Sequence, residues 1–398
     1  MKILIVSQYF YPETFRVNTL AKELVNLGHD VTVLTGYPQY PKGEIYPGYG
    51  FDIPYEKVWE GVKIERIKMR PRGKNAFGLL MNCYSFVKEG KKWVRKCKEK
   101  FDAVYVFEVS PITVGLPAIY YGKKFKTPVF FNVQDLWPEN VQVVLGVNNK
   151  FVIWVINKIV DKIYKGSDCI LCASRGFAEN IANRGVPKEK LVYWPQFYVR
   201  PDLKDAKKPE LYKDDCFNIV FAGNFGDAQG LDNLVEGANV LKDENVKWFL
   251  VGDGRAKERL LNKVKEYGIE DKVVFTGRVD EKTAESYIHF ADCGYLSFTQ
   301  NKLFDMTIPA KLQTYLACGT PILSAAGGES NKIVTEAECG ITTEKDGQAI
   351  ADGVKELMNK TKAEREKMVK NAEEYYEQNF TAERLIGELV KMMEEKNV

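Results

Sequence analysis

Short apolar runs alternate with amphipathic stretches along the first half of the chain. Runs such as KILIVS (2–7), DAVYVF (102–107) and PVFFNV (128–133) are almost continuously apolar, as strands of a parallel sheet are when helices cover both of its faces. Between the runs, apolar residues recur every three or four positions, which is typical of helices that bury one side. This alternation predicts a parallel, doubly wound α/β sheet.

The same alternation restarts at FNIVFAG (217–223) and continues to TPILSA (320–325). The stretch between the halves, RPDLKDAKKPELYKDD (200–215), is polar, contains two prolines and has no apolar period, so we interpret it as a linker. We predict a Rossmann-like domain at 1–200, a second at 201–375, and a C-terminal helix at 376–398 that packs back on the first domain.

Composition and charge narrow the class of protein. A net charge of +3 over 398 residues gives no support for binding nucleic acid. We expect no signal peptide from the opening residues MKILIVSQYFYPE, which become polar after a short apolar run. The apolar run FVIWVI (151–156) is far shorter than the roughly 20 residues that span a bilayer. Among the eight cysteines, only Cys169 and Cys172 form a CxxC, and a strand would point them to opposite faces. We expect a cytoplasmic or peripheral membrane protein with reduced thiols.

Glycine-rich turns follow several predicted strands of the second half. They are FAGNFGDAQG (221–230), VGDGR (251–255), FTGRV (275–279) and SAAGGES (324–330). Each alone also fits an ordinary strand–helix turn, but their succession favours a bound anion held by backbone N–H groups. The first turn has neither Arg nor Lys, so positive charge would have to come from elsewhere. Lys311 is a candidate, because Pro309 fits the first turn of a helix and Lys311 would then lie in that same turn.

Two loops of the first half carry candidate chemistry. SQYFYPETFRVN (7–18) has no G-x-G-x-x-G, which argues against a dinucleotide site. Its Arg16 could meet a phosphate or be a solvated surface residue. QDLWPEN (134–140) places Asp135 and Glu139 around Trp137. Carboxylates beside an aromatic ring suit the binding of sugar hydroxyls or general base catalysis, although they could instead cap the next helix.

Taken in order, SQYFYPE, QDLWPEN, FAGNFGDAQGL, VGDGR, FTGRV, PAKLQTYLACGTPIL and GGE resemble a retaining nucleotide-sugar glycosyltransferase of family 4. The resemblance covers essentially the whole chain. It implies a GT-B fold, in which two Rossmann-like domains face each other across a cleft, with the acceptor on the first and the donor on the second. DLWPEN, GNFGDAQGL and PAKLQTYLACG look most like enzymes that add amino-deoxy sugars, such as N-acetylfucosamine, during O-antigen or capsule assembly.

The sequence departs from the family pattern at several positions. Asn224 and Gln229 stand where the family commonly has Arg and Lys, and Met306 and Thr314 stand where it often has two glutamates. Gln134 replaces a frequent histidine. The usual phosphate cations, ribose-binding glutamate and active-site histidine therefore cannot be carried over.

We expect the missing positive charge to come from Lys311 and Arg255, with Arg16 from across the cleft as a further candidate. The resemblance implies that the leaving phosphate oxygen can itself take the proton of the acceptor hydroxyl. It also implies that no metal or other cofactor is needed. The candidate catalytic residues are Asp135, Lys311 and Glu139. Those for the donor are Gly223, Asn224, Gln229, Gly252, Arg255, Gly277, Arg278, Lys311, Thr314, Gly328, Glu329 and Arg16, and those for the acceptor are Tyr9, Glu13, Tyr37 and Trp137.

The implied donor is a UDP-sugar, and the implied acceptor is a saccharide on a polyprenyl diphosphate at the inner face of the cytoplasmic membrane. Residues 63–100 contain 13 Lys or Arg, three Asp or Glu, and interspersed Phe, Leu and Trp, which suits contact with an anionic membrane surface, although a solvated face would look similar. The helix at 150–166 could assist, but its apolar side is more typical of a core.

Two alternatives remain open from the sequence. The departures at Asn224, Gln229, Met306 and Thr314 would fit a scaffold subunit that has lost activity. A UDP-sugar 2-epimerase could share the fold, but we would expect several histidines in its cleft, and the chain has only His29 and His289.

Overall fold

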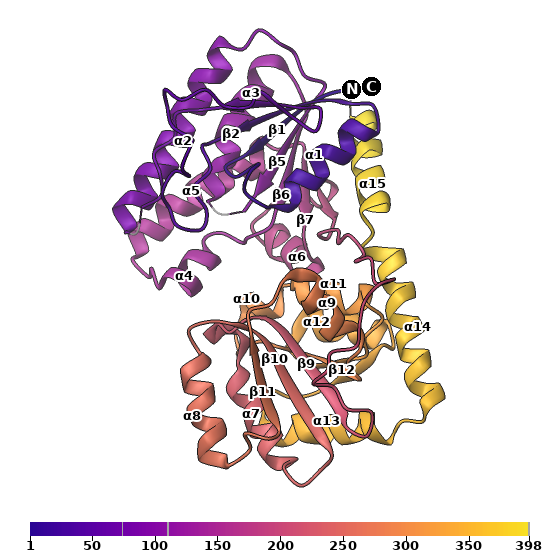
Figure 1. Cartoon of the computed structure of the whole chain (residues 1–398). Helices are drawn as coiled ribbons and strands as arrows, with labels where there is room; N and C mark the ends of the chain where they lie inside the picture. Colours follow the sequence, from indigo (N-terminus) through magenta and orange to yellow (C-terminus); the bar gives the residue numbers. More distant parts are fainter. Residues whose placement is uncertain (74, 110, 397–398) are drawn as a thin grey trace. The chain divides into compact units, whose positions relative to one another are not determined.

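The computed structural model describes residues 1–73, 75–109 and 111–396, which form two compact units (Figure 1). Unit 1 comprises Met1–Trp194 and Leu385–Val398, and unit 2 comprises Pro195–Arg384. Lys74, within the basic segment, and residues 397–398, at the end of the predicted C-terminal helix, lie outside the described residues.

Unit 1 is built on one sheet in which the described strands follow the order β3-β4-β2-β1-β5-β6-β7-β8. All neighbouring strands run parallel except β3 and β4. The strands are β1 (Lys2–Ser7), β2 (Asp30–Thr35), β3 (Val58–Trp59), β4 (Val62–Arg66), β5 (Ala103–Glu108), β6 (Val129–Val133), β7 (Cys169–Cys172) and β8 (Leu191–Tyr193).

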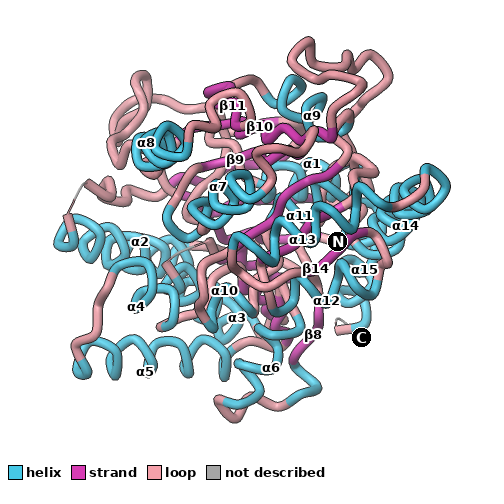
Figure 2. Tube along the Cα trace, turned by 90° about the horizontal axis from the view of Figure 1, so that it is seen from below, coloured by secondary structure: helices cyan, strands magenta, loops and turns pink. Residues whose placement is uncertain are grey.

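Helices cover both faces of this sheet (Figure 1). In Figures 1 and 2, α2, α4 and α5 lie on the same side of unit 1. The helices are α1 (Arg16–Asn26), α2 (Ala76–Lys96), α3 (Gly115–Phe125), α4 (Glu139–Leu145), α5 (Lys150–Gly166), α6 (Arg175–Asn183) and α15 (Ala382–Glu395), with short 3-10 turns at Ile112–Val114 and Lys188–Lys190.

Unit 2 has a second parallel sheet, with its described strands in the order β11-β10-β9-β12-β13-β14. They are β9 (Phe217–Asn224), β10 (Val246–Asp253), β11 (Val273–Gly277), β12 (Cys293–Ser297), β13 (Ile322–Ala325) and β14 (Gly340–Thr342). The helices are α7 (Leu231–Val240), α8 (Lys257–Tyr267), α9 (Glu281–His289), α10 (Lys302–Asp305), α11 (Ala310–Ala317), α12 (Gly328–Glu336), α13 (Gly347–Asn359) and α14 (Lys362–Asn379), with a 3-10 turn at Asp227–Gln229.

The core of unit 2 explains why its strands are continuously apolar. Successive residues of β9 belong to two different clusters: Ile219 and Phe221 pack in one, and Val220 and Ala222 in the other. Because side chains alternate across a strand, both faces of the sheet are buried and every position needs an apolar side chain.

An aspartate at the start of one strand fixes the start of its neighbour in both sheets. In each case the carboxylate accepts the backbone N–H of the neighbouring residue, and the aspartate's own N–H donates to that residue's carbonyl. The carboxylate distances are 2.7 Å for Asp102 with Lys2, 2.9 Å for Asp168 with Val129, and 2.8 Å for Asp292 with Asn218. The bonds from the aspartate N–H to the neighbour's carbonyl oxygen, for the same three pairs in the same order, measure 2.8, 2.9 and 2.9 Å. These bonds fix the register at the amino ends of the strands.

The predicted parallel sheets and most predicted strands and helices are confirmed within one to three residues. The short strands β3 and β14 and the helices α4, α6 and α10 were not predicted. Residues 200–215, all of them described, contain no helix or strand. The last helix, α15, contributes to unit 1 from Leu385 onward, where the indole Nε1 of Trp194 donates to the Leu385 carbonyl at 2.8 Å. All eight cysteines are unpaired thiols.

We predict that Asp292→Ala lowers the free energy of unfolding by about 1–3 kcal/mol, because it removes a charged acceptor from a backbone N–H. Chemical denaturation measures this change. Glu266→Ala, on the exposed side of α8, is the control and should stay within about 0.5 kcal/mol of the wild type. Equal stability of both variants would mean that the carboxylate does not fix the strand.

Candidate active site

The first glycine turn of unit 2 joins β9 to α7. Gly223 and Gly252 face each other on β9 and β10, with φ of 142° and 141°. A Cβ atom on Gly252 would lie only 1.9 Å from the carbonyl oxygen of Gly223. The backbones therefore approach so closely that this pair of positions requires glycine. Gly230 ends the turn at φ 59° and is the N-cap residue of α7.

Lys311, in the first turn of α11, lies directly on this glycine turn. Its Nζ donates to Oε1 of Gln229 at 2.6 Å and lies 4.7 Å from the centre of the Phe221 ring. A Cβ atom on Gly223 would come within 2.9 Å of the lysine Cε. In the described part of the chain, no carboxylate lies within ion-pair distance of Nζ. Burial lowers the pKa of Lys311 to about 8, because the desolvated ammonium is disfavoured.

The predicted cation Arg255 already has a partner. Its Nε lies 2.8 Å from the Asp227 carboxylate, and the arginine side chain is 77% exposed. Asp227 also pairs with Arg259 at 3.1 Å. Arg255 therefore lies beside the 221–230 turn, but its charge is partly balanced by Asp227, a residue of the 221–230 turn. Asn224, the other neutral replacement in the turn, is exposed.

The remaining predicted donor residues of unit 2 lie at the ends of other strands. Gly277 ends β11 with φ 75°, and Arg278 after it is exposed. Thr314 donates its hydroxyl to the Ala310 carbonyl of its own helix at 3.1 Å. Gly328 begins α12 with φ 50°, and a Cβ atom there would lie 1.9 Å from the Asp305 carbonyl oxygen.

Glu329, next in sequence, is almost fully buried in the first turn of α12. Its Oε1 pairs with Lys332 at 3.3 Å. Its Oε2 is buried and has no hydrogen-bond partner among the described residues. A carboxylate oxygen in this position is a candidate acceptor for a ligand hydroxyl.

In unit 1, QDLWPEN forms the connection from β6 to α4. Asp135 is half-buried, and Glu139 is the first residue of α4. The Glu139 Oε1 accepts a hydrogen bond from the Asn180 side chain at 3.2 Å, while its Oε2 and the Trp137 Nε1 are buried without a partner among the described residues. The peptide bond between Trp137 and Pro138 is cis. The structure assigns no side-chain cap to α4.

The predicted acceptor residues near the start of the chain hold loops together. The Glu13 carboxylate accepts backbone N–H groups of Gln39 and Tyr40, each at 2.7 Å, and of Phe10 at 3.3 Å. Burial raises the pKa of this carboxyl. Tyr9 is buried, and its ring stacks on the ring of Phe15 with 5.1 Å between the ring centres.

Tyr37 is buried as well. Its ring lies edge-on to the rings of Phe51 and Tyr55, with ring centres 5.4 and 6.1 Å away. Arg16 is the half-buried first residue of α1. A role in ligand binding stays a prediction for all of these residues.

Sequence reasoning missed Glu108, the last residue of β5. It is fully buried, and its Oε2 accepts the backbone N–H groups of Gln134 and Asp135, each at 3.1 Å. The only signal in the sequence was a carboxylate that interrupts the apolar run YVFEV.

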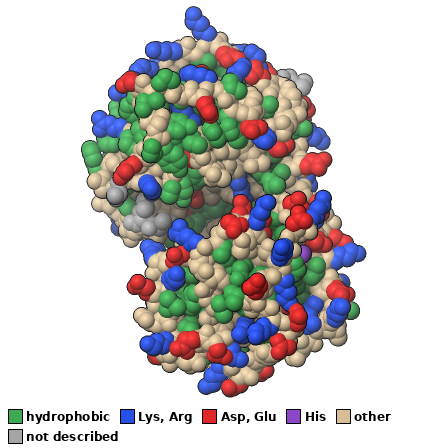
Figure 3. Space-filling view, in the orientation of Figure 1, with side chains coloured by type: hydrophobic (Ala, Val, Ile, Leu, Met, Phe, Trp, Pro, Cys, Tyr) green, Lys and Arg blue, Asp and Glu red, His purple; other side chains and the backbone are tan. Residues whose placement is uncertain are grey.

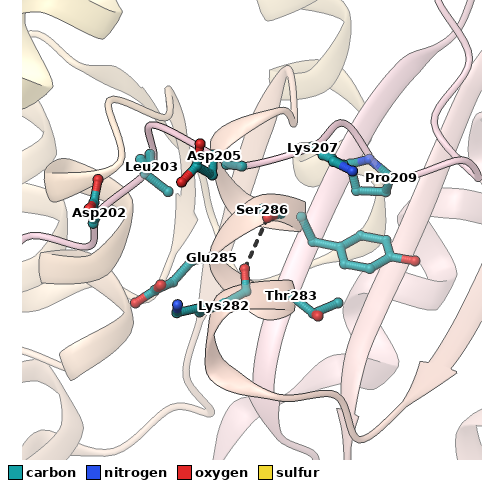
Figure 4. A pocket seen from close by; sticks show the side chains of 11 residues that line it. Asp202, Leu203, Asp205, Lys207, Pro209, Lys282, Thr283, Glu285 and Ser286 are labelled. Carbon is teal, nitrogen blue, oxygen red and sulfur yellow. Dashed lines mark hydrogen bonds between the residues drawn. The ribbon is translucent and has the colours of Figure 1, made fainter.

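A pocket of about 400 Å³ in unit 2 lies between the 202–209 segment and α9 (Figure 4). Side chains of both charges line it, including Asp205, Lys282 and Glu285. None of the predicted site residues is among its lining residues. Within the described residues, no group of three His, Cys, Asp or Glu side chains is placed to hold a metal ion, and no helix is long and apolar enough to cross a membrane.

Two family models match the chain in succession. The glycosyl transferase 4-like domain matches residues 14–196, and the glycosyl transferases group 1 model matches residues 203–375. WcaI of Escherichia coli (strain K12), named for a glycosyl transferase of colanic acid biosynthesis, is 22% identical, with 80% of this chain and 82% of that protein covered.

Solved structures are similar over almost the whole chain. Sucrose-phosphate synthase from Thermosynechococcus elongatus is 17% identical with a TM-score of 0.74, covering 99% of this chain and 98% of that chain. Anabaena Alr3699/HepE in complex with UDP is 13% identical with a TM-score of 0.70, covering 99% of this chain and 100% of that chain. The predicted GT-B fold of two Rossmann-like domains is confirmed, and the family models favour a glycosyltransferase over a 2-epimerase.

We predict that Gly252→Ala lowers the free energy of unfolding by about 3 kcal/mol or more, because the new Cβ would collide with the Gly223 carbonyl. Chemical denaturation measures the loss. Gly268→Ala is the control: Gly268 also has a positive φ of 63°, but nothing lies within 4 Å of its Cβ position, so the cost should be about 1 kcal/mol. Similar costs for the two variants would show that backbone conformation alone selects glycine.

Proposed function

We propose that this chain, a glycosyltransferase of the GT-B, family 4 type, transfers a sugar from a UDP-sugar to a lipid-linked saccharide with retention of configuration. The observation that carries this proposal is the ammonium of Lys311 on the Gly223 turn, whose hydrogen-bond partner there is the neutral side chain of Gln229. A partly buried cation beside a neutral partner is stabilised when an anion binds next to it. The complex of HepE with UDP supports a nucleoside diphosphate as that anion.

In this proposal the diphosphate of the donor lies on the turn at 223–230. Backbone N–H groups at the start of α7 and the Lys311 ammonium bind its oxygens. Gln229 holds the lysine until the ligand arrives. The carbonyl oxygen of Gln229 in turn accepts the Ser297 hydroxyl at 2.5 Å, which fixes the turn to the end of β12. The site is thus preorganised for negative charge.

The proposed reaction breaks the bond between the sugar anomeric carbon and the leaving phosphate oxygen. The acceptor hydroxyl oxygen forms the new bond on the same face, and its proton goes to the leaving phosphate oxygen. Lys311 stabilises the negative charge that develops on the diphosphate. Asp135 and Glu139 accept hydrogen bonds from sugar hydroxyls. We also propose that the transfer needs no divalent metal, so EDTA should leave the rate unchanged.

The proposed pathway is the synthesis of a cell-surface polysaccharide, such as an O-antigen or capsule, and the proposed sugar is an N-acetylated amino-deoxyhexose. The name of WcaI, which refers to colanic acid biosynthesis, supports the proposed pathway. The motifs DLWPEN, GNFGDAQGL and PAKLQTYLACG support the proposed sugar.

An exposed apolar surface of unit 1 supports a lipid-linked acceptor. Phe77, Leu80 and Tyr84 are exposed on α2, and Phe151 and Trp154 are 71% and 54% exposed on α5. Figure 3 shows hydrophobic side chains gathered over this part of unit 1. The expectation that α5 is mainly a core helix is therefore wrong for its first half, since the buried residues begin at Val160.

Lysines and arginines accompany these apolar side chains on both helices. Lys91, Lys92 and Arg95 lie on α2, and Lys150 and Lys158 lie on α5. Apolar side chains inserted among lipid headgroups, with cations beside them, are typical of proteins that bind an anionic bilayer. We propose that this surface contacts the inner face of the cytoplasmic membrane.

We predict that Lys311→Ala weakens UDP binding by about tenfold to a hundredfold, because a charge-assisted hydrogen bond is worth about 1.5–3 kcal/mol. The same variant should lower kcat for sugar transfer. Isothermal titration calorimetry with UDP measures binding at fixed salt. Lys265→Ala, exposed on α8, is the control and should bind UDP like the wild type. Unchanged UDP affinity in Lys311→Ala would contradict the proposed donor site.

The affinity for UDP should also depend on pH through Lys311. Its pKa in the free protein is lowered to about 8, so the ammonium is present at pH 7 and is lost as the pH rises through 8. Wild-type affinity should therefore fall between pH 7 and 9, whereas Lys311→Ala should show a flatter profile. Parallel profiles for both proteins would show that the lysine charge does not bind the diphosphate.

We predict that the double variant Phe151→Ser, Trp154→Ser reduces binding to anionic phospholipid vesicles by about tenfold or more, because each ring buries substantial apolar area in the interface. Vesicle sedimentation at low salt measures this. Leu261→Ser, exposed on α8 of unit 2, is the control and should bind like the wild type. Vesicle binding that survives the double variant would place the membrane contact elsewhere.

A further inference from the structure

The buried carboxyl of Glu108 holds the start of the loop that carries Asp135. Glu108 ends β5, and its Oε2 accepts the N–H groups of Gln134 and Asp135, each at 3.1 Å. The Gln134 N–H also lies 3.2 Å from the Glu108 carbonyl oxygen. Two consecutive residues beyond the end of β6 are thus attached through their backbones to the end of the neighbouring strand.

The arrangement mirrors the aspartate contacts at the other end of the sheet. At the amino end of β6, Asp168 accepts the Val129 N–H at 2.9 Å. At the carboxyl end, Glu108 takes the same role for the residues that leave the strand. The two sites differ in surroundings, because Asp168 is exposed and Glu108 is completely buried. Burying a carboxyl costs free energy unless it is hydrogen-bonded, and the two backbone N–H groups at 134–135 are the hydrogen bonds that Glu108 gains in return.

The surroundings of Glu108 contain no balancing cation among the described residues. Burial is the main cause that raises its pKa well above the usual value, and the nearby Asp135 charge raises it further. Within the described part of the chain, its Oε1 has no hydrogen-bond partner, and neither has the buried hydroxyl of Tyr164 on α5, which lies close enough to interact electrostatically. The raised pKa favours the neutral form of the carboxyl, and the geometry shows its Oε2 accepting both backbone N–H groups.

We propose that Glu108 is the positioning residue of the reaction: by holding the backbone at 134–135, it fixes where the Asp135 carboxylate points. The inference rests on the proposed function only in its second half, that Asp135 takes part in sugar transfer. The first half, that Glu108 orders the loop, can be tested without any substrate. The alternative is that Glu108 supports folding alone.

Hydrogen–deuterium exchange of the full chain tests the first half. Glu108→Ala should speed exchange of the Gln134 and Asp135 amides at least tenfold. Glu108→Gln keeps an oxygen acceptor in place and should stay within about threefold of the wild type. Asp168→Ala is the matched control, and it should speed exchange at Val129 but not at 134–135. Unchanged exchange at 134–135 in Glu108→Ala would overturn the proposal.

Steady-state kinetics with a UDP-sugar tests the second half. Glu108→Ala should lower kcat tenfold or more with unchanged UDP affinity, Glu108→Gln should restore it, and Asp135→Asn should lower kcat at least as much. Wild-type kcat in a folded Glu108→Ala whose loop exchanges quickly would overturn the positioning role. Wild-type kcat in Asp135→Asn would instead contradict the proposed role of Asp135, and it would overturn the positioning role with it, leaving the exchange result as evidence of loop ordering alone.

Discussion

The contact between the Lys311 ammonium and the Gly223 turn is the constraint on which the proposed donor site depends. The lysine reaches the turn because α11 begins at Ala310, after Pro309, and because Leu312, Tyr315 and Leu316 anchor the helix in the core. The lysine fits against the turn because residue 223 is glycine. A Cβ atom there would lie 2.9 Å from the lysine Cε. The close approach of β9 to β10 at Gly252 then leaves the backbone no room to withdraw. A partly buried ammonium with a neutral partner favours binding of an anion, and the fold holds it in this position before any ligand binds.

Much of this arrangement could be predicted from the sequence, because it depends on local patterns. Apolar runs located the strands, and glycines at their carboxyl ends located the turns. The absence of Arg and Lys from 221–230 made Lys311 the candidate cation, and in the structure its Nζ donates to Gln229. Its role in binding a diphosphate remains a prediction. The partner of Arg255 was harder to predict, since the Asp227 carboxylate belongs to a different turn and reaches the arginine only when β9 and β10 are in register.

Contacts that depend on register or burial could not be predicted in this way. Glu108 meets Gln134 and Asp135 across 26 and 27 positions of sequence, and the contact follows from the pairing of β5 with β6. Tyr9, Glu13 and Tyr37 have the residue types of a sugar site, yet the folded loops bury all three. The periodicity of α5 indicated an apolar side but not whether protein covers it. A hydrophobic pattern reports which side chains avoid water, and a folded chain is needed to show what they pack against.

The departures from the family pattern balance each other electrostatically. The resembled enzymes commonly have Arg and Lys in the first turn, and often two glutamates ahead of the later A-C-G. This chain has Asn224 and Gln229 in the turn, and Met306 and Thr314 at the two later positions. Replacing two cations together with two acids leaves the net formal charge of these four positions unchanged, and Lys311 remains the charge that faces the turn. A decaying site would be expected to lose these groups independently and to keep no lysine on the turn. The matched loss, together with the retained Lys311, is therefore better explained by a rebuilt donor site than by a scaffold without activity.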